Sequence, residues 1–565
     1  MIIPDSLLDR HQFYEEIVRQ CTATRTDRFN FYQVLRNYYL FGSADAKGAP
    51  YNKIGSTIET LSSFIYSPDT LRFSLMLGTE APEDDVFKAV ELSREVTEQW
   101  RLSRSHILFG LGLRWAHVFG IMLMKTVWDR NRVRSYLVEP HQFGVWREDL
   151  IDLADQEAFT HHYVISKTAL YDRLNGNPRR DSILSRVGTA SGIENPMIGA
   201  NGLSRLLVGA PVGGVSTSSA IPGSMSGVDG GIGGGGRGPT YDYAPQVSAE
   251  LVDMVDIYVW DDEQDDYRVI TRASPDVYIF DREAELMGHV KGIPPFTVIR
   301  PEFNLYDYFY GSSFAARLTW LQDWRTDRTY QIRNVLTKQV DPPMTFVGGG
   351  GISDEKLLGY GAAGGRLSFP TPGAKVDVHR PDLPADVFAE VNQIAAMFDD
   401  VAGLGHVLQG KGEPGVRSRG QADLMARLGS SRPKERAIAA EESAEELAGT
   451  ILRLVQDHSD QRFQYTSPTG HTATFIAEQF TRDYEVKVDA HSSSPIFVED
   501  RKHDAITLLE AKAIDRETLL DMFDPPNLQD LKERLKKIEK AELEQRREEM
   551  QMQAQAGKAK GHKAA

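Results

Sequence analysis

Apolar residues at helical spacing open the chain. Two consecutive segments carry them three and four positions apart, and a third helical segment spans residues 53–66, just ahead of Pro68. Because one face of an α-helix returns every three to four residues, this spacing predicts three helices. The apolar positions of the first two are Leu7, Leu8, Phe13, Ile17 and Val18, and then Phe31, Val34, Leu35 and Tyr38.

Strand-like runs alternate with helices in the next part of the chain. Residues 71–77 (LRFSLML), 133–145 and 160–165 have the spacing of strands, while 83–102 has that of a polar-faced helix. The apolar stretch 106–128 contains Arg114, His117 and Lys125 near or beyond its middle. A central arginine opposes insertion into a bilayer. We therefore expect a buried helix followed by a strand there, and an α+β fold without a membrane span.

Glycine, serine and proline dominate residues 199–238, within an insertion at about 191–245. Such a composition buries too little apolar surface to offset its conformational entropy, so a flexible insertion is predicted. A glycine-rich phosphate loop is the functional alternative. It is disfavoured because no strand leads into the segment and no Lys-Ser/Thr pair follows it.

Residues 255–260 (VDIYVW) and 267–270 (YRVI) predict a β-hairpin whose turn is acidic. The alternating Asp261, Glu263 and Asp265 suggest a calcium loop. Such a loop requires Gly at its sixth position and Glu at its twelfth, whereas Asp266 and Arg272 stand there. A solvated hairpin tip is the favoured interpretation.

A long helix without an internal breaker follows, from a cap at Ser312 or Ser313 to Pro342 and Pro343. It would be about 28 residues and roughly 42 Å long. This length exceeds that of the average helix in a globular domain. One stripe of the helix is apolar, and much of the remainder is basic. The apolar stripe is Phe314, Leu318, Leu321, Ile332 and Val335, and the basic positions are Arg317, Arg325, Arg328 and Arg333.

The C-terminal third returns to helices around short strands. A glycine-rich, strand-like segment at 344–381 precedes a helix at 385–401, and a polar loop at 403–420 leads to a helical region from about Ser418 to His458, kinked at Pro433. Further predicted strands lie at 472–476 and 484–488, and a charged helical hairpin closes the chain.

Composition narrows the function. The 565 residues favour three or four domains, and the formal net charge is −16. A free-standing duplex-binding domain is normally basic, so an acidic protein that meets DNA must use local basic positions or guide DNA without gripping it. The single Cys21 excludes an intrachain disulfide, and the acidic N-terminal segment does not look like a signal peptide.

No catalytic or metal centre is predicted. Residues 405–412 (GHVLQGKG) match the spacing of a phosphate-binding loop, but Gly412 stands where Ser or Thr must hold magnesium, and a helix precedes the segment. The adjacent His161 and His162 would point to opposite faces of a strand and cannot simply share a metal. Trp320 and Trp324 lie one helical turn apart and are expected to pack. We expect no enzyme activity and no cofactor.

Residues 292–408 resemble the portal, or head-to-tail connecting, proteins of tailed bacteriophages. The residues that carry the resemblance are IPPFTVIRPEF, YGSSFAARLTWLQDWRTDRTYQIRNVLTKQVDPPM and LPADVFAEVNQIAAMFDDVAGLGHVLQGKGEP. Residues 136–149 (YLVEPHQFGVWRED) and 513–540 (AIDRETLLDMFDPPNLQDLKERLKKIEK) agree with it. A long helix, a small strand module and a returning helix also suit packing against neighbours in a closed ring.

The resemblance implies an α/β wing, two long stem helices, a small β-containing clip and a helical crown. Its glycine-rich insertion departs from the family pattern. The order of domains would be wing 1–311, stem helix 312–340, clip 341–383, stem helix 384–402, tunnel loop 403–420, a long helix with wing completion 421–498, and crown 499–565.

By resemblance, the chain is a structural, non-enzymatic subunit of a ring, expected to be a dodecamer, at the capsid vertex of a virion. Double-stranded DNA would pass through the ring during packaging and ejection. Expected partners are a terminase motor at the clip, the major capsid protein and tail adaptor proteins, after assembly in the host cytoplasm and without a membrane. Lys411, Arg417 and Arg419 of the tunnel loop would contact DNA, and the four stem arginines would supply basic positions. The alternatives are an ATP-driven, terminase-like packaging enzyme, and another virion protein such as a head-tail adaptor or coat subunit.

Overall fold

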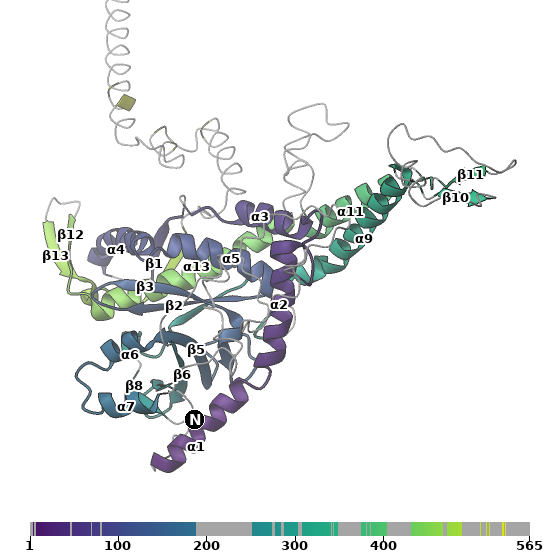
Figure 1. Cartoon of the computed structure of the whole chain (residues 1–565). Coiled ribbons are helices and arrows are strands. Elements are labelled where there is room, and N and C mark those ends of the chain that lie inside the picture. The colour runs from purple at the N-terminus through teal and green to yellow at the C-terminus, as the bar shows by residue number, and fades with distance from the viewer. Residues whose placement is uncertain are drawn as a thin grey trace, which may run out of the picture.

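The computed structural model describes residues 4–488 with gaps, arranged as a body with a projecting pair of helices (Figure 1). The gaps are residues 5–6, 46–47, 69–70, 79–81, 188–250, 274–276, 284–286, 303–307, 341, 343, 348–374, 380, 383, 385, 404–430 and 467–471, and only isolated positions are described beyond 488. The helices are α1 (Leu7–Cys21), α2 (Arg25–Phe41), α3 (Lys53–Ile65), α4 (Glu83–Leu102), α5 (Ser105–Phe119), α6 (Lys167–Arg173), α7 (Arg180–Arg186), α9 (Phe314–Val340), α11 (Asp386–Ala402) and α13 (Ser431–His458), with short 3-10 turns η1 (Pro140–Gln142) and η3 (Ala477–Gln479).

The described strands form five antiparallel sheets. The largest has the order β4-β5-β6-β7-β8 and the next β3-β2-β9, while β1-β14, β10-β11 and β12-β13 are pairs. The strands are β1 (Phe73–Leu77), β2 (Met122–Trp128), β3 (Val133–Val138), β4 (Phe143–Val145), β5 (Ala158–Ser166), β6 (Leu251–Asp261), β7 (Asp266–Ala273), β8 (Tyr278–Glu283), β9 (Phe296–Ile299), β10 (Met344–Val347), β11 (Lys375–Val378), β12 (Arg462–Thr466), β13 (Thr472–Ile476) and β14 (Tyr484–Val488). The fold class is therefore mixed helix and sheet, as the spacing predicts.

The five-stranded sheet is covered on both faces, because side chains alternate between its two sides along each strand. Val255, Ile257 and Val259 of β6 pack against α1. On the opposite face, Tyr258 joins an aromatic cluster that reaches Phe296 of β9, with the ring centroids 5.6 Å apart. The two larger sheets therefore pack through this aromatic layer.

A buried ion pair crosses that layer. Lys125 Nζ of β2 lies 3.1 Å from Asp256 Oδ2 of β6, and both side chains are almost fully buried. The hydroxyls of Tyr163 and Thr271 donate to the other carboxylate oxygen, at 3.1 and 2.8 Å. Burial acts to raise the pKa of Asp256, but Lys125 and the hydroxyl bond bring it below its usual value. The carboxylate is thus ionised and fully engaged between the sheets.

Helix α13 lies at the centre of the main core, although it comes from the C-terminal part of the chain. Its buried face is rich in small and aliphatic side chains, which let it approach α3, α4, β2 and β9 closely. Strand β14 then pairs with β1, with Val488 opposite Phe73 and Tyr484 opposite Leu77. The body is therefore closed by segments from both ends of the described chain.

Several local expectations are confirmed and one is corrected. The stretch 106–128 is the buried helix α5 followed by β2, and no helix among the described residues is long and apolar enough to span a membrane. The predicted strand 133–145 is interrupted, because Pro140 starts the turn η1 between β3 and β4. Helix α13 is described from Ser431, and residues 404–430 ahead of it lie outside the described residues, so the kink expected at Pro433 stays a prediction.

The acidic hairpin between β6 and β7 forms where it was predicted. Asp262, Glu263 and Asp265 are exposed at its tip, whereas Asp266 is buried. Asp266 Oδ1 accepts the backbone N–H of Gly292 at 2.8 Å and so fastens the hairpin to the following loop. Within the described residues, no three His, Cys, Asp or Glu side chains are grouped to hold a metal ion.

Replacing Lys125 with Met is expected to lower the free energy of unfolding by about 3–5 kcal/mol, because it leaves Asp256 ionised and buried without its cation. Replacing both residues, as Lys125→Met with Asp256→Leu, should recover part of that loss. Urea denaturation measures both effects. Lys487→Met is the control, since Lys487 pairs with Glu445 at a side-chain exposure of 40% and should cost less than about 1 kcal/mol. Equal losses for Lys125→Met and the control would contradict the role given to the buried pair.

Glu139 and His141 form a second buried pair, beneath α2. Glu139 Oε2 lies 3.1 Å from His141 Nδ1, and both side chains are 2% exposed. Burial raises the pKa of Glu139 to about 8, against an opposing effect of Arg36, and lowers the pKa of His141 to about 3 with help from Arg25 and Arg36. At neutral pH both groups are therefore uncharged.

Glu139→Gln is expected to make the protein relatively more stable at high pH. In the unfolded chain the carboxyl loses its proton near 4.5, whereas the folded protein keeps it up to about 8, so the wild type loses stability as the pH rises through this window. Glutamine has no proton to lose, and its advantage should grow to the order of 3 kcal/mol at the upper end. Parallel melting-temperature curves for the two proteins across this pH range would contradict the assignment.

Candidate functional site: the projecting helical hairpin

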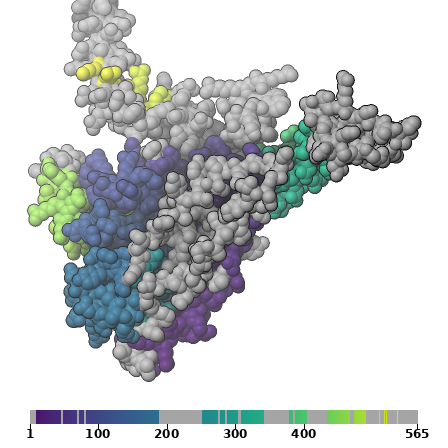
Figure 2. All heavy atoms as spheres, viewed as in Figure 1, coloured from purple at the N-terminus to yellow at the C-terminus, as the bar shows by residue number. Residues whose placement is uncertain are grey.

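Helices α9 and α11 form an antiparallel hairpin that leaves the body and carries β10 and β11 at its far end (Figure 1). Helix α9 has 27 residues and α11 has 17, so α9 is about 40 Å long at 1.5 Å per residue. The space-filling view shows the same projection in teal and green (Figure 2). Its two helices lie where helices were predicted, at 312–340 and 384–402.

Burial is confined to the root of the hairpin, where it meets the body. The buried residues of α9 all precede Asp323, and those of α11 all follow Asn392. In the outer part of α9, Tyr330 is 41%, Leu336 44% and Val340 86% exposed. Large apolar side chains on Trp320 and, in α11, Phe388 are also about half exposed. The outer hairpin thus presents apolar groups that this chain does not cover.

Glu390 of α11 holds the two helices together along the exposed part. Its Oε1 accepts hydrogen bonds from Trp324 Nε1 at 3.1 Å and from Arg328 Nε at 2.9 Å. Trp324 in turn stacks on Trp320, with centroids 6.2 Å apart and planes inclined by 20°. The two tryptophans therefore pack against each other and the hairpin, as predicted from their spacing.

Arg436 of α13 fastens the root of the hairpin. Its guanidinium donates to Glu302 Oε1 at 2.9 and 2.6 Å and to the carbonyl of Ala402, the last residue of α11, at 3.2 Å. It also lies 4.5 Å from the ring centre of Phe314, the first residue of α9. One buried cation thereby joins α13, the segment after β9 and the starting and ending turns of the hairpin.

Other polar contacts brace the root from α2 and α3. Lys53 Nζ lies 3.0 Å from Asp399 Oδ1, with side-chain exposures of 14% and 11%. Buried Gln322 accepts the backbone N–H of Lys53 at 3.0 Å and donates to the carbonyl of Tyr51 at 2.8 Å. The hairpin therefore has a fixed base on the N-terminal helices.

Contacts within the chain hold three of the predicted stem arginines, Arg317, Arg328 and Arg325. Arg317 lies 3.0 Å from Glu302, Arg328 pairs with Glu390, and Arg325 lies over the ring of Tyr51 at 4.1 Å. Burial lowers the pKa of Arg325 below its usual value. Arg333 is exposed on the outer part of α9. Their contact with DNA stays a prediction, but the first three also stabilise the hairpin.

The predicted tunnel-loop residues Lys411, Arg417 and Arg419 lie outside the described residues, as do the glycine-rich insertion and the segment 405–412.

His161 and His162 lie on opposite faces of β5, as expected. His161 packs on Phe296, whereas His162 Nδ1 accepts a hydrogen bond from Arg25 at 2.9 Å. Burial lowers the pKa of both imidazoles well below the usual value.

Neither Arg436 nor Glu302 was among the residues expected to form a site. Each is an ordinary charged residue in a polar context, and they are 134 positions apart. The only local signal is Arg436 on the apolar face of a predicted helix, among Ala437, Ala439 and Ala440.

Comparison with known proteins identifies no relative. No protein-family model matches the chain, and no curated protein matches it. The function is therefore argued from the sequence and from the geometry of the hairpin.

Replacing Arg436 with Met should loosen the hairpin root and lower the free energy of unfolding by about 3 kcal/mol, because Glu302 loses its buried cation. Hydrogen exchange should rise at the first turns of α9 and the last turns of α11. Arg482→Met is the matched control, since Arg482 pairs with Asp457 at a side-chain exposure of 69% and its loss should cost less than about 1 kcal/mol. If hydrogen exchange at both helix ends is unchanged in Arg436→Met, Arg436 does not fasten the root of the hairpin.

Proposed function

We propose that this chain is the subunit of a bacteriophage portal, a ring that conducts double-stranded DNA at the capsid vertex. The observation that carries the proposal is the outer part of the hairpin. There α9 beyond Gln322 and α11 before Ile394 extend away from the body, and none of their residues is buried. Helices in proteins owe most of their stability to the packing of an apolar face against other elements. Neighbouring copies in a closed ring would provide that packing, and head-to-tail contacts of this kind generate rings.

The order of elements supports the same proposal. The long helix α9, the small strand pair β10–β11 and the returning helix α11 follow the stem–clip–stem order of the family that the sequence resembles. The pairing of β1 with β14 agrees with a wing built from N-terminal and late segments. On this proposal β10–β11 would meet the packaging motor, and the body would contact the capsid protein, with tail adaptors joining the completed virion.

The distribution of charge supports a ring through which DNA slides, and not one that binds DNA tightly. The chain has 80 acidic and 64 basic residues, and the arginines Arg317 and Arg328 of α9 are paired with glutamates. Binding to duplex DNA depends on cations that replace counterions on phosphates. A surface whose cations are already paired would let DNA slide, leaving its contacts to the basic residues of the predicted tunnel loop.

The experiment that tests the proposal is electron microscopy of the purified chain, with light scattering for its mass. A ring with an axial channel is expected, without a requirement for nucleotide. A stable monomer at every concentration and salt level would refute the proposal. ATP hydrolysis by the pure chain would instead favour a packaging enzyme, and closed shells or solid discs would favour another virion protein.

Replacing Tyr330 and Leu336 together with Glu is expected to abolish the ring while leaving the subunit folded. Both side chains are exposed in the single chain, so its melting temperature should change little, whereas charges buried between neighbours are costly. The control is Leu102→Glu with Ile107→Glu, which changes side chains 65% and 58% exposed on the body. Rings formed by the hairpin variant as readily as by the control would contradict the interface.

Replacing Lys411, Arg417 and Arg419 together with Ser is expected to reduce DNA packaging or retention without affecting the ring. Each phosphate contact is weak and sensitive to salt, so the effect depends on the many copies in a ring. The DNA content of assembled particles measures it, with Arg94→Ser as a control in α4 and electron microscopy of the ring. Normal DNA content would remove the DNA-contact role, and broken rings would reassign these residues to assembly.

A further inference from the structure

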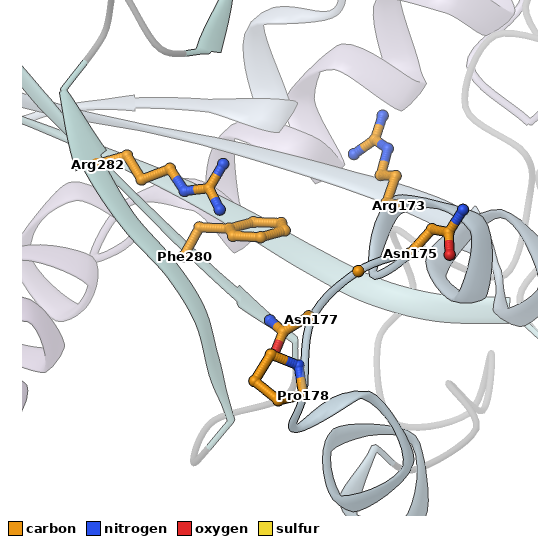
Figure 3. Close-up of a pocket in the computed structure, with 7 residues that line it drawn as sticks. Arg173, Asn175, Asn177, Pro178, Phe280 and Arg282 are labelled. Atoms are coloured by element: carbon orange, nitrogen blue, oxygen red, sulfur yellow. The ribbon is translucent and has the colours of Figure 1, made fainter.

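A polar cleft lies on the body between the α6–α7 loop and the edge strand β8, away from the hairpin (Figures 1 and 3). Its volume is about 370 Å³. Phe280 and Arg282 are two positions apart on β8, so their side chains lie on the same face of the strand and form one wall of the cleft. The other wall is formed by Arg173, Asn175 and Asn177 (Figure 3). Among the residues that the structure describes, no acidic one lines the cleft, in a chain whose net charge is −16.

Both arginines of the cleft are held by aromatic rings rather than by carboxylates. Arg282 lies 4.7 Å from the centre of Phe280, and Arg173 lies 5.6 Å from that of Tyr163 while donating to its hydroxyl at 3.1 Å. Within the described residues, neither guanidinium has a carboxylate at ion-pair distance. These ring contacts restrict the guanidinium groups and leave N–H donors for a ligand.

Asn177 adds a third donor. Its Oδ1 accepts the backbone N–H of Arg179 at 2.9 Å, which sets the orientation of the amide. The Nδ2 group then points to the side of Phe280 (Figure 3). The preceding Gly176 has φ of +82°, a left-handed conformation that turns the chain between α6 and α7 and brings Asn177 to the cleft.

We propose that this cleft is a binding site for a phosphate group. Two cationic forks and an amide donor approach one space from different walls, and forked guanidinium donors match the oxygens of phosphate. Two cations that have no carboxylate at ion-pair distance among the described residues suit a doubly charged group, whereas a carboxylate would need only one of them. The open cleft also leaves room beside Phe280 for whatever carries the phosphate, which is either a small molecule or a nucleic-acid backbone.

Calorimetric titration of the full chain with inorganic phosphate, at ionic strength matched with chloride, tests the site. Saturable binding is expected in the wild type, and Arg173→Gln with Arg282→Gln should weaken it at least about 10-fold, since each removes a charge-assisted bond. Arg282→Lys keeps the charge without the fork and should be intermediate. Arg180→Gln is the control, because Arg180 also lies over a tyrosine ring but does not line the cleft.

Absence of saturable phosphate binding by the wild type, or equal affinity in the double variant, would overturn the proposal. The melting temperatures of the variants verify that they fold, and these exposed side chains should change them little. Titrations with adenosine monophosphate and with a short DNA duplex then identify the source of the phosphate. A loss of duplex binding in the double variant but not in Arg180→Gln assigns the site to the nucleic-acid backbone. A loss confined to the mononucleotide assigns it to a small molecule. The cleft lies on the body, so this test does not depend on ring assembly.

Discussion

The contact between Arg436 and Glu302 is the constraint on which the position of the hairpin depends. The guanidinium of Arg436 reaches the segment after β9, the last carbonyl of α11 and the first ring of α9. All four segments must be in place before its donors are satisfied, and an unpaired buried cation would be costly. The direction of the hairpin is therefore fixed once α13 is packed in the core.

The body supports that contact by packing segments from distant parts of the chain around α13. The helix lies against α3, α4 and the three-stranded sheet, and β14 returns to β1. Lys125 and Asp256 join the two larger sheets across an aromatic layer that would otherwise tolerate sliding. Directional polar contacts at both places fix the geometry that non-directional apolar burial leaves open.

Rigidity at the root and exposure at the tip together suit the proposed ring. A hairpin braced by Lys53, Gln322 and Arg436 holds its outer apolar side chains at a fixed distance from the body. Preorganisation of this kind lowers the entropy lost when neighbouring copies associate. The phosphate cleft lies on the body between α6, α7 and β8, so the two surfaces can serve different partners.

The sequence by itself determined most of the elements, because helix and strand periodicities are local properties. It predicted α9, α11 and the β6–β7 hairpin near their observed bounds, and it favoured a solvated hairpin tip over a calcium loop. It also ran one strand through Pro140, where the chain turns to enter a second sheet.

Only the tertiary structure decided which charged residues meet. Arg436 and Glu302 are 134 positions apart, Lys125 and Asp256 are 131 apart, and neither pair has a motif. The cleft likewise joins the α6–α7 loop to β8 across the glycine-rich insertion, so no spacing along the chain could indicate it. The physical reason is that periodicity reports which face of an element is buried. The partner on that face is set by the path of the whole chain.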